Sequence, residues 1–268
     1  RGLGDVYKRQ GKDKALATFG GQIIDTTTQD VLWEREPAKP LTPASATKVL
    51  TLAAATLKLD EEERLTTEVV AGEHEGEIVI KAAGDVWLTD ERLDELAEQI
   101  QQKMDTVTRV SIDTSIWAGP DQAPGWDDDN IDGGFVAPIQ PAMLYGGRIG
   151  EKTGDVPRSH EPALDVARAL ASRLGTDKAD TSSAPENTEV IAATESEPLA
   201  LRAQEAVKDS DNVMAEAIAR ELAVSQGAEA SFEGATKTML DVLKGHGIDI
   251  SDITLKAVSY THLRAHET

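Results

Sequence analysis

TPASATKVLTLAAA, residues 42–55, predicts a helix over about 45–58 that begins at a serine and is apolar on almost every side. A helix of that kind has to be buried in the protein core. Burial disfavours the charged form of a lysine, so Lys48 is costly there unless it has a task. The stretch therefore predicts a buried helix that carries one functional amine.

Ser45 and Lys48 are three residues apart, which places both on one helical face, so the amine can reach the hydroxyl. Ser45 also lies at the helix N-terminus, where free backbone N–H groups and the helix dipole favour negative charge. A nucleophile, a base and half of an anion site can thus come from one turn. Taken alone, a serine near a helix start is usually just a cap, and the buried apolar context is what favours a catalytic role.

A second group of polar residues, Ser210-Asp211-Asn212, stands where two predicted helices meet. Serine and asparagine at a helix start are ordinarily caps. Combined with a buried Ser-x-x-Lys helix, they supply what serine acyl transfer requires. Ser210 can pass a proton from the base to a leaving amine, and Asn212 can hold both Lys48 and a substrate amide.

Composition narrows the class of protein. The 268 residues carry a formal net charge of -21, which argues against nucleic acid or an anionic membrane as a partner. The chain has no cysteine, so disulfides, zinc–thiolate sites and a cysteine nucleophile are excluded. It also has no run of 18 apolar residues, and we expect no transmembrane segment in it.

Hydrophobic periodicity predicts a mixed α and β fold. Strands are expected around 23–24, 31–33, 66–70, 77–80 and 107–112, and helices at 90–102, 162–174, 196–208, 211–224 and 231–244. Residues 117–161 indicate long loops, and 176–188 a polar linker. This order suggests one domain made of 11–68 and 186–257, with an inserted strand-rich domain at 69–185.

At this point the two motifs resemble those of the penicillin-binding proteins, whose signature set is Ser-x-x-Lys, Ser-x-Asn and Lys-Thr-Gly. More narrowly, the chain is similar to the D-Ala-D-Ala carboxypeptidase/endopeptidase group of the penicillin-binding-protein-4 type, peptidase family S13. The segments that carry the resemblance are 31–34, 43–48, 64–68, 84–89, 137–139, 146–148, 210–217 and 231–235.

The resemblance implies a fold of α+β class, an α/β sandwich of the β-lactamase/transpeptidase type, with the insertion between the first two motifs. It implies that Ser45 attacks the carbonyl between two D-alanines, that neutral Lys48 takes its proton, and that Ser210 and Asn212 assist. No metal or organic cofactor is implied. The implied partners are peptidoglycan stem peptides ending in D-Ala-D-Ala and β-lactam antibiotics, in an extracytoplasmic location.

The third motif does not stand where the resemblance requires it. Lys152-Thr153-Gly154 precedes Ser210 and lies in a loop-like stretch, whereas the family has this motif on a strand after Ser210. We therefore expect Lys152 to be a decoy and the last sheet strands to be missing beyond about Leu255. Loss of one oxyanion donor typically costs about 10²–10³ in rate, so this fragment is expected to be inactive or impaired.

Both ends differ in character from the rest. Residues 1–10 and about 258–268 resemble translated sequencing-adapter read-through, and we expect them to be non-native.

Other classes of function stay open at this stage. A β-lactamase or esterase of the same fold, or a non-catalytic penicillin-recognising sensor or scaffold, uses the same residue types. A secreted acidic adhesion protein with accidental motifs is a further alternative.

Overall fold

The structure is a computed structural model of the chain, and it describes residues 19–39, 41–124, 126–251 and 253–259. The chain divides into two compact units, one that ends at Pro43 and one that begins at Ala44.

The first unit contains a β-hairpin, as the sequence predicted. Strand β1 (Gly21–Ile24) pairs antiparallel with β2 (Val31–Arg35). The turn is held by Asp25, whose Oδ1 accepts the N–H groups of Thr27 and Thr28 at 2.8 and 3.1 Å. Such an Asx-type turn explains why a polar Asp-Thr-Thr-Thr run separates the two strands.

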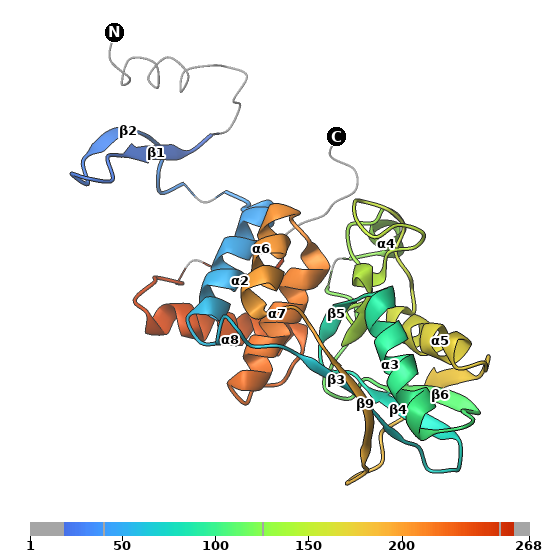
Figure 1. Cartoon of the computed structure of the whole chain (residues 1–268). Coiled ribbons are helices and arrows are strands. Elements are labelled where there is room, and N and C mark those ends of the chain that lie inside the picture. Colours follow the sequence, from blue (N-terminus) through green and yellow to red (C-terminus); the bar gives the residue numbers. More distant parts are fainter. Residues whose placement is uncertain (1–18, 40, 125, 252, 260–268) are drawn as a thin grey trace. The chain divides into compact units, whose positions relative to one another are not determined.

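The second unit contains a five-stranded sheet with the order β8-β6-β4-β3-β9 (Figure 1). Strand β3 runs antiparallel to both β4 and β9, whereas β4, β6 and β8 are mutually parallel. The strands are β3 (Thr66–Ala71), β4 (Glu77–Lys81), β6 (Arg109–Asp113), β8 (Ala179–Thr181) and β9 (Val190–Glu195).

One face of this sheet is covered by two amphipathic helices, α3 (Asp90–Lys103) and α5 (Pro162–Arg173). Alternate strand residues such as Ile78, Ile80 and Ile112 point toward them and are almost completely buried. Each such side chain contributes roughly 1.5–3 kcal/mol by leaving water. The opposite face carries Val79 together with polar residues such as Arg109 and Ser111.

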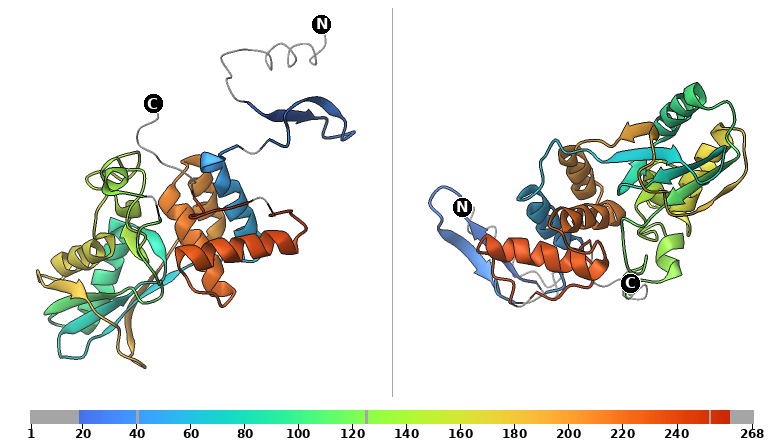
Figure 2. Two further views of the ribbon diagram at one scale, coloured as in Figure 1. Left: turned by 180° about the vertical axis from the view of Figure 1, so that it is seen from behind. Right: turned by 90° about the horizontal axis from the view of Figure 1, so that it is seen from below.

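The other part of the second unit is a group of four helices around its own apolar core. These are α2 (Thr47–Thr56), α6 (Leu199–Lys208), α7 (Asn212–Ser225) and α8 (Phe232–Gly245). Helix α2 packs against the other three, and Figure 2 shows this helical group beside the sheet from two further sides. The predicted buried helix is thus confirmed, although the Val49 side chain is exposed.

Small elements connect the two cores. Strand β5 (Asp85–Leu88) pairs in parallel with β7 (Ala142–Leu144), and a short helix α4 (Asp128–Asp132) and two 3-10 turns, η2 (Ala44–Ala46) and η3 (Tyr145–Gly147), complete the unit.

Two expectations need correction. The stretch 117–161 is not only loop, because it contains α4 and β7. The stretch 176–188 is not only linker, since β8 lies within it. Strand β8 is short and polar because it is an edge strand, and edge strands commonly carry charge rather than apolar side chains.

The remaining predicted helices and strands are confirmed to within a few residues. The proposed boundaries of an inserted domain at 69–185 stay a prediction. Within the described part of the chain, every helix is too short or too polar to cross a membrane. We expected residues 1–10 and about 258–268 to be non-native, and of these 1–10 and 260–268 lie outside the described residues. Val258 and Ser259 are described and fully buried, and their non-native origin stays a prediction.

Candidate active site

The first pair of predicted site residues meets at the start of α2. Turn η2 runs directly into the helix, and Lys48 Nζ lies 3.1 Å from Ser45 Oγ. The Lys48 side chain is buried, with 2 % of the residue exposed, while Ser45 is half-buried. The hydroxyl is thus reachable from solvent, and the amine beneath it is shielded.

The second pair is brought to the same amine from 162 residues away. Lys48 Nζ lies 3.3 Å from Ser210 Oγ and 2.6 Å from Asn212 Oδ1. All four predicted residues, Ser45, Lys48, Ser210 and Asn212, therefore converge on one nitrogen. Their catalytic roles stay predictions, but their meeting in space is a property of the fold.

Two backbone hydrogen bonds at the C-terminus of helix α6 position Ser210. Its N–H donates to Val207 O at 3.2 Å, and the next N–H, of Asp211, donates to Ala206 O at 3.0 Å. These two bonds form a Schellman motif, in which the residue at the Ser210 position takes a left-handed conformation and is usually glycine. Ser210 accordingly has φ +53°. A serine here has a local conformational cost that the surrounding contacts must offset.

Asn212 is placed by the start of α7. The Asp211 side chain caps that helix by accepting the Met214 N–H at 2.9 Å. Asn212 uses both ends of its amide, because Oδ1 faces Lys48 while Nδ2 donates to Phe135 O at 2.8 Å. The amide nitrogen carries two hydrogens, so one remains for a substrate carbonyl.

A further acceptor completes the surroundings of the amine. Ser259 O lies 3.2 Å from Lys48 Nζ, and the Ser259 backbone is held by Glu216, whose Oε1 accepts N–H groups from Val258 and Ser259 at 2.8 Å. Glu216 is fully buried. Sequence reasoning assigned Glu216 no role, since a glutamate inside a predicted helix gives no signal of its own.

Burial lowers the pKa of Lys48 to about 8, although the negative charges of Asp211 and Glu216 oppose that shift. A neutral amine has two N–H donors and one lone pair, whereas the charged form has three donors. Asn212 Oδ1 and Ser259 O can only accept, so they take the two donors. The lone pair is then left for the hydroxyls of Ser45 and Ser210, which is the arrangement a general base requires.

Lys152, the lysine of the misplaced motif, is found elsewhere. It lies in an irregular loop, with its amine 3.5 Å from Glu91 Oε1 and 4.9 Å from the centre of the Tyr145 ring. Among the interactions of the described residues, none joins Lys152 to the four predicted catalytic residues. The expectation that this tripeptide is not on a strand is confirmed.

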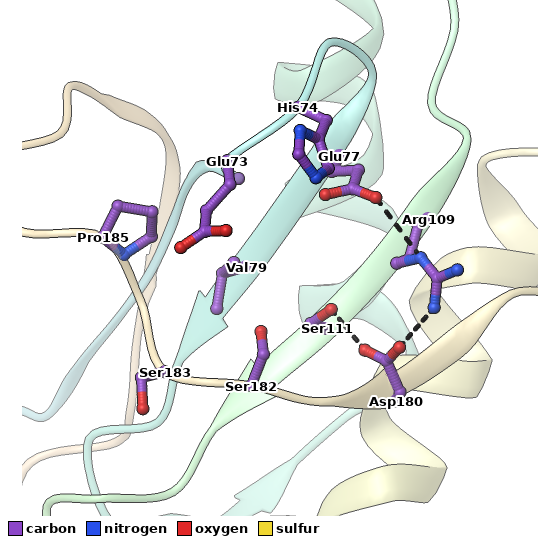
Figure 3. Close-up of a pocket in the computed structure, with 11 residues that line it drawn as sticks. Glu73, His74, Glu77, Val79, Arg109, Ser111, Asp180, Ser182, Ser183 and Pro185 are labelled. Atoms are coloured by element: carbon purple, nitrogen blue, oxygen red, sulfur yellow. Dashed lines mark hydrogen bonds and ion pairs between the residues drawn. The ribbon is translucent and has the colours of Figure 1, made fainter.

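A polar cavity of about 360 Å³ lies on the open face of the sheet, apart from this site (Figure 3). Figure 3 shows Arg109 between Glu77 and Asp180, with Ser111 also bonded to Asp180. Arg109 thus pairs with two carboxylates across neighbouring strands. The cavity therefore resembles the self-paired polar face of a sheet more than a second reactive centre.

The sequence matches the model of the D-Ala-D-Ala carboxypeptidase 3 (S13) family over residues 8–157 and 150–259. Two serine hydroxyls and one asparagine amide surround the buried Lys48 amine in the described structure. The chain belongs to the S13 family, as the sequence resemblance indicated.

Curated relatives agree with this assignment. The chain is 41 % identical over 271 residues to Carboxypeptidase DacB of Mycolicibacterium smegmatis, covering 95 % of this chain and 59 % of the relative. It is 40 % identical over 259 residues to a carboxypeptidase of Mycobacterium tuberculosis, covering 91 % of this chain and 56 % of that relative. The chain thus spans somewhat more than half the length of these relatives.

The fold has a counterpart among solved structures. Penicillin binding protein 4 (DacB) from Haemophilus influenzae superposes with a TM-score of 0.74 at 19 % identity, over 90 % of this chain and 70 % of that one. At this identity the likeness concerns the fold, and it confirms the expected α+β transpeptidase-like class.

Proposed function

We propose that the protein is a serine D-Ala-D-Ala carboxypeptidase that acts on peptidoglycan stem peptides through an acyl-enzyme on Ser45. The observation that carries the proposal is the convergence of Ser45 Oγ, Ser210 Oγ and Asn212 Oδ1 on the buried Lys48 amine. Membership of the S13 family and the names of the curated carboxypeptidase relatives support the substrate class.

The geometry suggests how the residues would divide the reaction. Ser45 Oγ attacks the carbonyl carbon between the two D-alanines, and its proton passes to the neutral Lys48 amine 3.1 Å away. As the C–N bond breaks, the proton moves through Ser210, 3.3 Å from Lys48, to the leaving amine. Water then hydrolyses the Ser45 ester and releases the shortened peptide.

β-Lactams would enter the same site, because their strained amide acylates the same hydroxyl. This expectation is supported by the penicillin-binding name of the structural neighbour. Since cross-linked and uncross-linked stem peptides lie outside the cytoplasmic membrane, we also propose an extracytoplasmic location. Cleavage of cross-links is the second reaction that the same acyl-enzyme chemistry permits.

A labelling experiment tests the proposal. It uses the full-length protein, because the chain spans only 59 % of the length of its relative. A fluorescent penicillin should label the wild-type protein covalently, and Ser45→Ala should abolish the label. The wild type should also release D-alanine from a pentapeptide that ends in D-Ala-D-Ala.

The alternatives predict different results. A non-catalytic penicillin-recognising sensor would stay acylated and release no D-alanine. A β-lactamase would hydrolyse the penicillin rapidly and leave the pentapeptide intact. Absence of Ser45-dependent labelling in the folded full-length protein would overturn the proposal.

A further inference from the structure

Asp211, the middle residue of Ser210-Asp211-Asn212, is bound by two arginines that come from a distant part of the sequence. Its Oδ2 accepts hydrogen bonds from Nη2 of Arg148 at 2.9 Å and from Nη2 of Arg158 at 3.4 Å. The side chains of all three residues are at most 5 % exposed. Burial opposes the charge of Asp211, yet Arg158 and Arg148 hold the pKa of its carboxyl below the ordinary value.

The other donors of the two arginines reach backbone carbonyls of the segment 134–154. Arg158 donates to Gly134 O at 2.9 Å and to Gly146 O at 2.7 Å. Arg148 donates to Tyr145 O and to Gly154 O, both at 2.9 Å. The arginines therefore connect Asp211 to several turns of this segment at once, which a single ion pair would not do.

The conformation of these turns leaves little room for adjustment. Tyr145, Gly146 and Gly147 are successive residues with left-handed φ values of +49°, +67° and +79°. Arg148 also lies over the Trp87 ring, 5.0 Å from its centre. A Cβ added at Gly146 would come within 2.7 Å of Arg158 Nη1, so the guanidinium packs closely against this backbone.

On the other side, Asp211 controls the two site residues that flank it. Its Oδ1 caps α7 through the Met214 N–H, so Oδ1 fixes the helix that begins with Asn212 while Oδ2 is held by the arginines. Ser210, directly before it, has φ +53° and is the residue in the unfavourable conformation. A carboxylate fixed at both oxygens prevents this turn from relaxing and moving Ser210 Oγ away from Lys48.

We propose that Arg148 and Arg158 are positioning residues for the acyl transfer: they clamp Asp211 and thereby hold Ser210 and Asn212 against Lys48. The clamp connects the segment 134–158 to the catalytic turn, and the bond from Asn212 Nδ2 to Phe135 O adds a second connection to the same segment. Among the described residues, the hydrogen bonds of the two arginines go to Asp211 and to backbone carbonyls and not to Ser45 or Lys48, so we expect their effect to pass through Asp211.

This inference rests on the proposed function, so the experiment measures both separately in the full-length protein. Arg148→Ala should lower the rate constant of Ser45 acylation by a fluorescent penicillin about 10–100-fold, because small displacements of reacting groups cost about that much. The concentration dependence that reports non-covalent binding should change little. Arg148→Lys should recover part of the rate, because it restores one charge contact to Asp211 but not the fork of bonds.

A double-mutant cycle and a matched control separate positioning from stability. When Asp211→Asn is already present, adding Arg148→Ala should cause little further loss in the acylation rate, since both substitutions act through one contact. The control is Arg202→Lys, at another buried arginine, which pairs with Glu221 at 2.6 Å within the helical group. It should lower the Tm without changing the acylation rate of the folded protein.

Hydrogen exchange gives a readout that does not depend on activity. Amides of residues 206–216 should lose protection in Arg148→Ala and keep it in Arg202→Lys. An Arg148→Ala protein with unchanged protection there, or with an acylation rate within about twofold of the wild type, would overturn the clamp. A wild type that cannot be acylated would instead overturn the proposed function, and exchange alone would then decide whether the arginines hold the turn.

Discussion

At the scale of single residues, Lys48 decides what the site can do. Its amine is surrounded by two carbonyl acceptors and two hydroxyls, and the carbonyls account for both donors of a neutral amine. The same nitrogen in its charged form would have no lone pair for Ser45. In the proposed mechanism, the protonation state of Lys48 therefore sets the reactivity of Ser45.

The rate of acylation should follow the deprotonation of Lys48. Burial lowers its pKa to about 8 against the charges of Asp211 and Glu216, so the fraction of neutral amine rises about tenfold between pH 7 and pH 9. Penicillin acylation of the full-length protein, measured across pH 6–10, should rise in the same proportion and then level off. Lys48→Arg should be inactive throughout, because a guanidinium stays charged. A profile that is flat from pH 7 to 9 would contradict a lysine base.

Replacement of Ser210 by glycine should affect the stability of the protein and its rate of acylation in opposite directions. Glycine accepts the left-handed φ of +53° without strain, so Ser210→Gly should stabilise the protein by roughly 0.5–1 kcal/mol and raise the Tm by about 1–4 °C. The same change removes the hydroxyl that relays the proton, and acylation should fall at least about tenfold. The matched control Ser210→Ala should lose the same activity without the gain in Tm. Equal melting temperatures for the glycine and alanine variants would show that the turn is not strained.

The sequence predicted these site residues for a physical reason. Ser45 and Lys48 are one helical turn apart, so their contact is local and follows from helix geometry. The approach of Ser210 and Asn212 is not local. It was expected because a hydroxyl and an amide complement the Ser-x-x-Lys pair in serine acyl transfer, and because the two motifs together resemble a family. Arg148 and Arg158 could not be predicted, since each lies more than 50 residues from Asp211 and an arginine in a Gly-rich loop ordinarily faces solvent.

At the scale of elements, α7 carries the site at one end and a buried ionic group in its middle. Arg220, four residues after Glu216, is 1 % exposed and packs against the rings of Phe232 and Trp117, at 4.1 and 5.3 Å from the ring centres. Its Nη1 lies 3.4 Å from Glu216 Oε2. The other oxygen of Glu216 holds the backbone at Val258 and Ser259. Helix α7 thus organises both the turn at Ser210 and Asn212 and the segment whose Ser259 carbonyl faces Lys48.

Truncation of Glu216 should be costly. Glu216→Ala leaves Arg220 as a buried charge without its carboxylate and frees two buried N–H groups, so the free energy of unfolding should fall by about 3–5 kcal/mol. Urea unfolding measures this loss. The control is Asp241→Ala, which breaks the exposed pair with Lys237 on α8 and should leave the urea midpoint almost unchanged. Similar losses in the two variants would mean that Glu216 does not hold its neighbours as the contacts indicate.

Elements were predicted unequally well. Long amphipathic helices such as α3 and α5 can be predicted from the regular spacing of their apolar residues, because each helix buries one face on a sheet. Strand β8 (Ala-Asp-Thr) was missed because it is only three residues long, lacks a large apolar side chain and pairs only with β6. Strand formation at a sheet edge depends on the partner more than on the sequence of the strand itself.

At the scale of the whole molecule, the order of motifs along the chain matters as much as their presence. A motif search finds Ser-x-x-Lys, Lys-Thr-Gly and Ser-x-Asn in that order, but only the first and last meet in space. The loop of Lys152 instead provides the Gly154 carbonyl that receives a bond from Arg148. The tripeptide is therefore connected to the site through backbone, whereas its lysine side chain is directed to Glu91 and Tyr145.

Replacement of Lys152 tests this distinction. The side chain is 59 % exposed, and its ion pair with Glu91 is an exposed one of small energetic value. Lys152→Ala in the full-length protein should therefore leave the rate of penicillin acylation within about twofold of the wild type, which corresponds to the usual effect of a surface substitution. If Lys152 instead bound the carboxylate of the ligand, the loss of that charge would weaken non-covalent binding and lower the acylation efficiency more than tenfold, because a charged group would be left without its partner. Measurement of the acylation rate against penicillin concentration separates these outcomes. A more than tenfold loss of acylation efficiency would show that Lys152 belongs to the active site after all.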